Sequence, residues 1–135
     1  MLDELYPADR AYTAQHLWVL NEEGTWRVGI TRHSYGALDA IIGLELPEVD
    51  ERLEAGELIG FVQSLVGAMQ ELYAPASGVV CELNDEIVDD PEVLFVDDDP
   101  YGDGWLIRMV PDDPSAYAAL LDRDDYVERG GVSID

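Results

Sequence analysis

The chain has 135 residues, among them 30 acidic residues, seven arginines and no lysine, and its formal net charge is −23. Nucleic-acid phosphates and anionic lipid surfaces would be repelled, so neither is an expected partner. The single cysteine, Cys81, excludes an internal disulfide and any site made of several cysteines. No apolar stretch is long enough to span a membrane and the acidic N-terminus is unlike a secretion signal, so one cytoplasmic domain over residues 1–135 is expected. The absence of lysine indicates a high-salt source or a strongly biased genome, and the composition leaves both open.

The first part of the chain predicts short strands separated by turns. Tyr12–Leu20 and Thr25–Ile30 are rich in aromatic and β-branched residues, and the turn formers between them predict a β-hairpin. A short helix is expected over Arg32–Ile41, followed by a strand over Ile42–Leu46. Val49–Glu57 is polar and is expected to be a connector.

The middle of the chain predicts a second hairpin within Gly60–Gly78. Its arms, Gly60–Leu65 and Met69–Tyr73, are strand-like and face each other across residues 66–68. The proline and glycine that follow the second arm predict a turn before the next apolar run.

The last part predicts two more strands and then helices. The strands are expected over Gly78–Leu83 and Trp105–Val110. Asp113 is a suitable N-cap for a helix from Pro114 to Leu121, because proline is favoured at the first helical position, and a second helical turn is expected through Tyr126. Many short strands with few helices predict a mainly β fold, a small barrel or sandwich with a short internal helix and helices at the C-terminus.

No pattern of catalytic or metal-binding residues stands out. Cys81 lies in an alternating strand, so we expect a buried, inert thiol rather than a reactive one. His16 and His33 fit no standard ligand spacing and are expected to be structural or exposed. The aspartates at positions 89–90, 97–99, 122 and 124–125 do not follow the EF-hand pattern, so a solvated acidic surface is expected rather than a metal site. We therefore expect that the chain is not an enzyme.

Several short motifs, taken together in their order and spacing, are specific for one protein family. They are Tyr12-Thr13 with His16 and Trp18-Val19; Val28–Thr31; Leu38 through Val49; Ala55-Gly56 with Gly60; Leu72-Tyr73 with Pro75 and Ser77-Gly78; and Asp99–Ile107. Over about residues 12–126 the chain resembles the H protein of the glycine cleavage system, a family of the biotinyl/lipoyl-domain group. The resemblance implies a barrel-sandwich hybrid of two antiparallel sheets, with a lipoyl-lysine at the tip of the central hairpin.

The chain departs from the family at that tip. The family's hairpin reads E-S-V-K-A, with lipoate joined to the lysine. Counting forward from Ala55-Gly56 sets Val66 on the lysine position, whereas counting back from Leu72-Tyr73 sets Gly67 there, so the hairpin is one residue longer than the family's. Neither residue has an amine and the chain contains no lysine, so we expect that no lipoate is attached and that there is no cofactor.

The retained body and the altered tip lead to a functional expectation. We expect a non-lipoylated H-protein-like domain that acts as a protein-interaction adaptor or regulatory subunit. Its partners would be proteins, such as glycine-cleavage-type or lipoate-handling enzymes. They would contact an acidic surface around Asp97–Gly104 and the hairpin tip, which comprises Leu65, Val66, Gly67 and Ala68. The alternatives are a small-ligand binder that uses the cleft of the missing lipoyl arm and a subunit of a lipoyl-dependent complex of the glycine-cleavage type.

Overall fold

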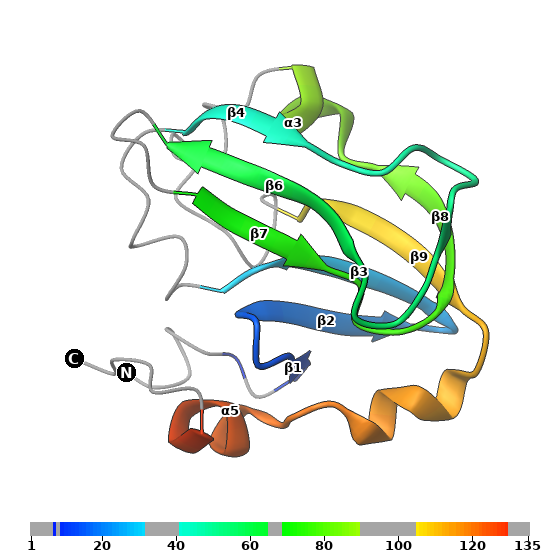
Figure 1. Cartoon of the computed structure of the whole chain (residues 1–135). Helices are drawn as coiled ribbons and strands as arrows, with labels where there is room; N and C mark the ends of the chain where they lie inside the picture. The colour runs from blue at the N-terminus through cyan, green and yellow to red at the C-terminus, as the bar shows by residue number, and fades with distance from the viewer. Residues whose placement is uncertain (1–6, 8, 32–40, 65–68, 90–104, 130–135) are drawn as a thin grey trace.

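Two antiparallel sheets face each other in the computed structural model, which describes residues 7, 9–31, 41–64, 69–89 and 105–129 (Figure 1). The six-stranded sheet has the spatial order β1 (Ala11–Tyr12), β2 (Leu17–Glu22), β3 (Thr25–Ile30), β9 (Ile107–Pro111), β8 (Gly78–Leu83) and β5 (Arg52–Leu53). The three-stranded sheet has the order β4 (Ile41–Glu45), β6 (Leu58–Ser64) and β7 (Met69–Tyr73). The mainly β prediction is confirmed.

Three short helical segments accompany the sheets. They are α3 (Asp85–Asp89), the 3₁₀ helix η1 (Pro114–Ala119) and α5 (Arg123–Arg129). η1 and α5 run along the β1–β2 side of the six-stranded sheet, away from the three-stranded sheet (Figure 1). Asp113 caps η1 as predicted, because its carboxylate accepts hydrogen bonds from the amide and the hydroxyl of Ser115, at 3.0 and 2.7 Å.

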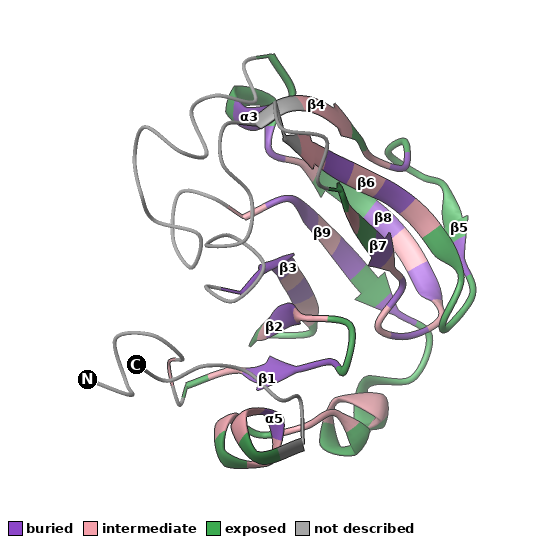
Figure 2. Cartoon of the chain, turned by 60° about the vertical axis from the view of Figure 1, so that its left-hand side comes forward, coloured by how far each residue is buried: buried purple, intermediate pink, exposed green. Residues whose placement is uncertain are grey.

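The main core fills the space between the two sheets. Residues of successive strand positions point to opposite faces, so Leu17 and Val19 of β2 enter this core whereas Trp18 between them points to the other side. The other fully buried members include Trp26, Ile30, Leu53, Val62, Val80 and Met109. Figure 2 shows the buried residues in purple along the strands.

A second, smaller core lies between the outer face of β2 and α5. It contains Tyr12, Trp18 and Tyr126, all three fully buried, and the Tyr12 and Tyr126 rings stack with their centroids 4.9 Å apart. The Tyr126 hydroxyl lies 2.8 Å from the Thr31 hydroxyl and 2.7 Å from Nδ1 of His16. The C-terminal helix is therefore fixed to the sheet by both apolar and polar contacts.

The first predicted hairpin is confirmed, but its first strand is divided. Tyr12–Leu20 forms two strands, β1 and β2, which pair with each other in antiparallel register. The chain reverses between them, where the amide of His16 donates to the carbonyl of Thr13 at 3.1 Å and His16 has a φ of 69°. Aromatic and β-branched content alone does not reveal such a turn.

Other boundaries differ in detail. The expected helix over Arg32–Ile41 lies outside the described residues except for Ile41, which begins β4. The expected connector Val49–Glu57 contains the two-residue strand β5, which pairs with β8. The expected strand over Trp105–Val110 is β9, which begins at Ile107. These short segments owe their state to partners that are distant in sequence.

Gly60 allows β4 and β6, neighbouring strands of the three-stranded sheet, to approach closely. A Cβ added at Gly60 would lie 2.1 Å from the carbonyl oxygen of Glu45, which is backbone and cannot turn away. A Cβ at Gly43, in the neighbouring strand, would meet only the side chain of Gln63 at 3.5 Å, an ordinary contact. The spacing of β4 and β6 therefore depends on Gly60 and not on Gly43.

We predict that Gly60→Ala destabilises the protein by about 1–3 kcal/mol, the usual range for overpacking, because β4 and β6 must separate. Urea unfolding followed by tryptophan fluorescence measures the change. The matched control Gly43→Ala should leave the free energy of unfolding unchanged or slightly increased, since alanine restricts the unfolded chain. Equal losses in the two variants would contradict the close-approach explanation.

Candidate functional site

The central hairpin is the candidate site, and its arms are confirmed as β6 and β7. The strands pair from Leu58↔Tyr73 to Gln63↔Met69, with a shift of register between Leu58 and Gly60. The predicted tip residues, Leu65, Val66, Gly67 and Ala68, lie outside the described residues. The site is therefore built from the arms of the hairpin and from β4, which pairs with β6 on its other side.

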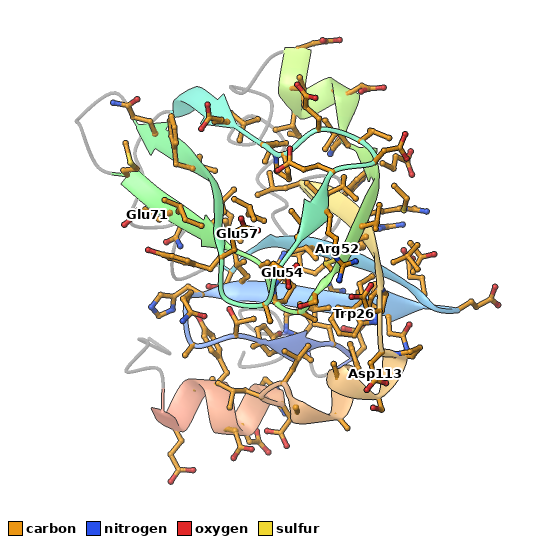
Figure 3. The ribbon with its side chains drawn as sticks, turned by 45° about the vertical axis from the view of Figure 1, so that its right-hand side comes forward. Trp26, Arg52, Glu54, Glu57, Glu71 and Asp113 are labelled. Atoms are coloured by element: carbon orange, nitrogen blue, oxygen red, sulfur yellow. The ribbon has the colours of Figure 1, made fainter. Side chains whose placement is uncertain are left out.

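The outward face of the three-stranded sheet combines one aromatic ring with two carboxylates. Phe61 of β6 is directly opposite Glu45 of β4 and directly opposite Glu71 of β7, so the three residues form a row across the sheet. Val62, the next residue of β6, points inward and is fully buried. The row is therefore on the outer face, and Glu71 projects outward from β7 in Figure 3.

A shallow depression of about 380 Å³ lies over this row. Its lining includes Glu45, Phe61 and Glu71, together with Leu58 and Met69, which are 54% and 51% exposed. Exposed apolar side chains that are rimmed by polar groups mark interaction surfaces. The depression can receive a side chain that is apolar along its length and cationic at its end.

A second polar cluster lies at the edge formed by β5. Arg52 donates two hydrogen bonds to the two carboxylate oxygens of Asp112, one of them at 3.1 Å, and also lies beside Glu54 (Figure 3). The hydrogen bonds and charge of Asp112 raise the pKa of Arg52, and the hydrogen bonds from Arg52 lower the pKa of Asp112. The pair joins β5 to the residue that follows β9, so its part is structural.

Cys81 is exposed, so the prediction of a buried thiol is wrong. The register of β8 with β9 shifts between Val80 and Glu82, and a β-bulge of this kind interrupts the alternation of inward and outward residues. Val80 is fully buried, whereas both Cys81 and Glu82 are exposed. The sequence pattern could not reveal the bulge, because the bulge depends on the pairing with β9.

The other candidate residues make structural contacts or lie outside the described residues. His16 contacts Tyr126, in line with the expected structural role, whereas His33 lies outside the described residues. Asp122 accepts a hydrogen bond from the amide of Asp125 at 2.8 Å at the start of α5, and residues 90 and 97–99 are not described. Within the described part of the chain, no group of three or more His, Cys, Asp or Glu side chains is placed to hold a metal ion.

Comparison with known proteins identifies the family. The family model described as glycine cleavage H-protein matches residues 10–130. The chain belongs to the glycine cleavage H-protein family. A protein from Psychrobacter cryohalolentis named glycine cleavage system H protein is 42% identical over 121 residues, which are 89% of this chain and 94% of that protein. A protein of the same name from Chromohalobacter salexigens is 43% identical over 121 residues, which are 89% of this chain and 90% of that protein.

A solved structure confirms the fold that the resemblance implied. The crystal structure of a glycine cleavage system H protein from Mycobacterium marinum superposes with a TM-score of 0.81 and 39% identity, over 93% of this chain and 99% of that chain. The barrel-sandwich architecture expected in the sequence analysis is therefore confirmed. Among the described residues, no helix combines the length and the apolar character needed to cross a membrane.

The same comparisons overturn the functional expectation. The chain was expected to be an adaptor or regulatory subunit, and the alternatives were a small-ligand binder and a subunit of a lipoyl-dependent complex of the glycine-cleavage type. Relatives about 42% identical over most of the chain are named glycine cleavage system H protein, and they are matched over nearly their full length. The adaptor interpretation is wrong because it gave the altered tip more weight than the agreement of the whole body with this family.

We predict that Cys81 of the native protein reacts completely with dithionitrobenzoate without denaturant, because its thiol is exposed. Absorbance of the released thionitrobenzoate measures the reaction, and Cys81→Ser gives the background. A reaction that begins only after unfolding in guanidinium would contradict the bulge in β8.

Proposed function

We propose that this chain serves as the H-protein component of a glycine cleavage system and docks onto the enzymes of that system. The observation that carries the proposal is the match of the H-protein family over residues 10–130, which includes every described strand and helix. The names of the relatives support the system, and the agreement with the M. marinum structure supports a body of the same shape. We propose no catalytic site of its own for the chain, since its part in such a system is to be bound by enzymes.

We further propose that the hairpin end of the three-stranded sheet is the part that faces those enzymes. The depression on the outward face of this sheet supports the choice, together with Met69, a half-exposed apolar side chain next to the hairpin tip. The net charge of −23 supports rapid association with basic partner surfaces, because opposite charges steer diffusing proteins together.

Attachment of lipoate to a side chain does not fit this sequence. The family resemblance implies an amide with lysine, and the chain has no lysine at the hairpin tip or anywhere else. We therefore propose that no side chain of this protein is lipoylated. Docking and lipoylation are separate properties, because the first depends on the body and the second on a single amine, so they need separate experiments.

The docking proposal predicts binding to glycine-cleavage enzymes purified from the same source. Sedimentation velocity should show a complex at low salt that weakens as the salt concentration rises, because salt screens the charges that favour association. The variant Met69→Glu should reduce binding, since it places a charge in the exposed apolar part of the hairpin face, whereas Val110→Glu, a 48% exposed position on β9, should not. Absence of any complex at low salt would refute the proposed function.

The lipoylation proposal predicts no covalent product with lipoate ligase, ATP and lipoate. Intact-mass spectrometry should show an unchanged mass, whereas Val66→Lys or Gly67→Lys should gain the mass of one lipoyl group. Which variant accepts the group also decides between the two alignments of the hairpin. A lipoyl group found by peptide mapping on any side chain of the unaltered protein would overturn the proposal.

A further inference from the structure

We propose that the row Glu45, Phe61, Glu71 is a binding site for an arginine side chain presented by a partner protein. The inference deepens the proposed function and in that respect rests on it, since the docking enzymes would supply the arginine. The row crosses three paired strands and lies in the depression of the hairpin face. The ligand follows from the chemistry of these three side chains.

The spacing of the row suits a guanidinium group. Residues directly opposite each other on neighbouring antiparallel strands have Cβ atoms about 4.5–5.5 Å apart, so Glu45 and Glu71 flank Phe61 on its two sides. A planar guanidinium can stack on an aromatic face and donate hydrogen bonds in its plane to carboxylates at its edges. An ammonium group can make the same charge contacts but cannot stack in this way.

The two carboxylates are available for such a ligand. Among the described residues, Arg10, Arg27, Arg52, Arg108 and Arg123 all form ion pairs with acidic residues other than Glu45 and Glu71. No ion pair in the described part of the chain includes Glu45 or Glu71. The acidic charge of the row is thus not neutralised by the arginines whose positions are described.

The neighbouring apolar residues complete the site. Leu58 and Met69 line the same depression, and their exposed side chains can cover the methylene groups of an arginine stem. Gly60 leaves room for the backbone of Glu45, so β4 can pair closely with β6 and Glu45 lies beside Phe61. The site is therefore more than a patch of negative charge, because it provides a ring, two carboxylates and an apolar border.

Charge restricts the kind of partner. A second copy of this chain also carries a net charge of −23 and would be repelled, and nucleic acids present phosphates rather than cations. A protein that presents an arginine from a basic surface matches both the negative charge of the row and the shape of its depression.

The test uses the full chain and a probe that carries a single arginine side chain, N-acetyl-arginine amide. In ¹⁵N-HSQC titrations the probe should shift the amides around Phe61 and Glu71 in a saturable way. N-acetyl-citrulline amide, which is neutral and of nearly the same shape, should leave them unchanged. N-acetyl-lysine amide should bind more weakly than the arginine probe.

Three variants test the row. Phe61→Leu, Glu45→Gln and Glu71→Gln should each weaken binding of the arginine probe by about two- to five-fold, the size expected for exposed cation–π contacts and ion pairs. Glu128→Gln on α5 removes the same charge on the other side of the molecule and should have no effect. The spectra themselves report whether each variant is folded.

Some results would overturn the inference. They are equal shifts with citrulline, equal affinity for lysine, shifts scattered over the acidic surface, or an equal loss of affinity in Glu128→Gln. Failure of the probe to bind while the enzymes still form a complex would reject the arginine site and leave the proposed function intact. Binding of the probe without any complex with the enzymes would reject the proposed function and leave the arginine site intact.

Discussion

The packing of the three-stranded sheet against the six-stranded sheet is the constraint on which the rest of the structure depends. Val62 and Leu72 of the hairpin and Leu17, Val28 and Ile107 of the larger sheet are buried in the same core. Burial of apolar side chains is the main favourable contribution to folding, and side chains alternate along a strand. Once the inner residues of β6 and β7 are buried, the residues between them must face outward, and this fixes the face that the hairpin presents.

Near its β1–β2 end, the six-stranded sheet buries side chains on both of its faces. Trp18 points away from the main core and meets Tyr126 of α5, so the C-terminal helix covers the outer face there. The three-stranded sheet has no such cover on its outer face within the described residues, and its ring, carboxylates and exposed apolar side chains remain accessible. The contrast between a covered and an uncovered face is the structural reason for placing partner contacts on the hairpin side.

The functional conclusion rests on the body of the protein rather than on the hairpin tip. Family, relatives and solved structure agree over nearly the whole chain. The lack of lysine is an equally plain property of the sequence, and it bears on covalent attachment alone. The hairpin tip does not decide the whole function, since a single side chain determines a modification whereas a whole surface determines which enzymes are bound.

The sequence by itself determined the strand-rich character, both hairpins, the cap at Asp113 and the family, because these depend on local alternation, turn residues and motif spacing. The tertiary structure alone decided where strands break and which side chains meet. The bulge that exposes Cys81 and the meeting of Glu45 with Phe61 depend on pairing between segments that are distant in sequence. A one-residue change of register would turn a strand's side chains to the other face, and which distant strand a segment pairs with is decided only in the folded chain.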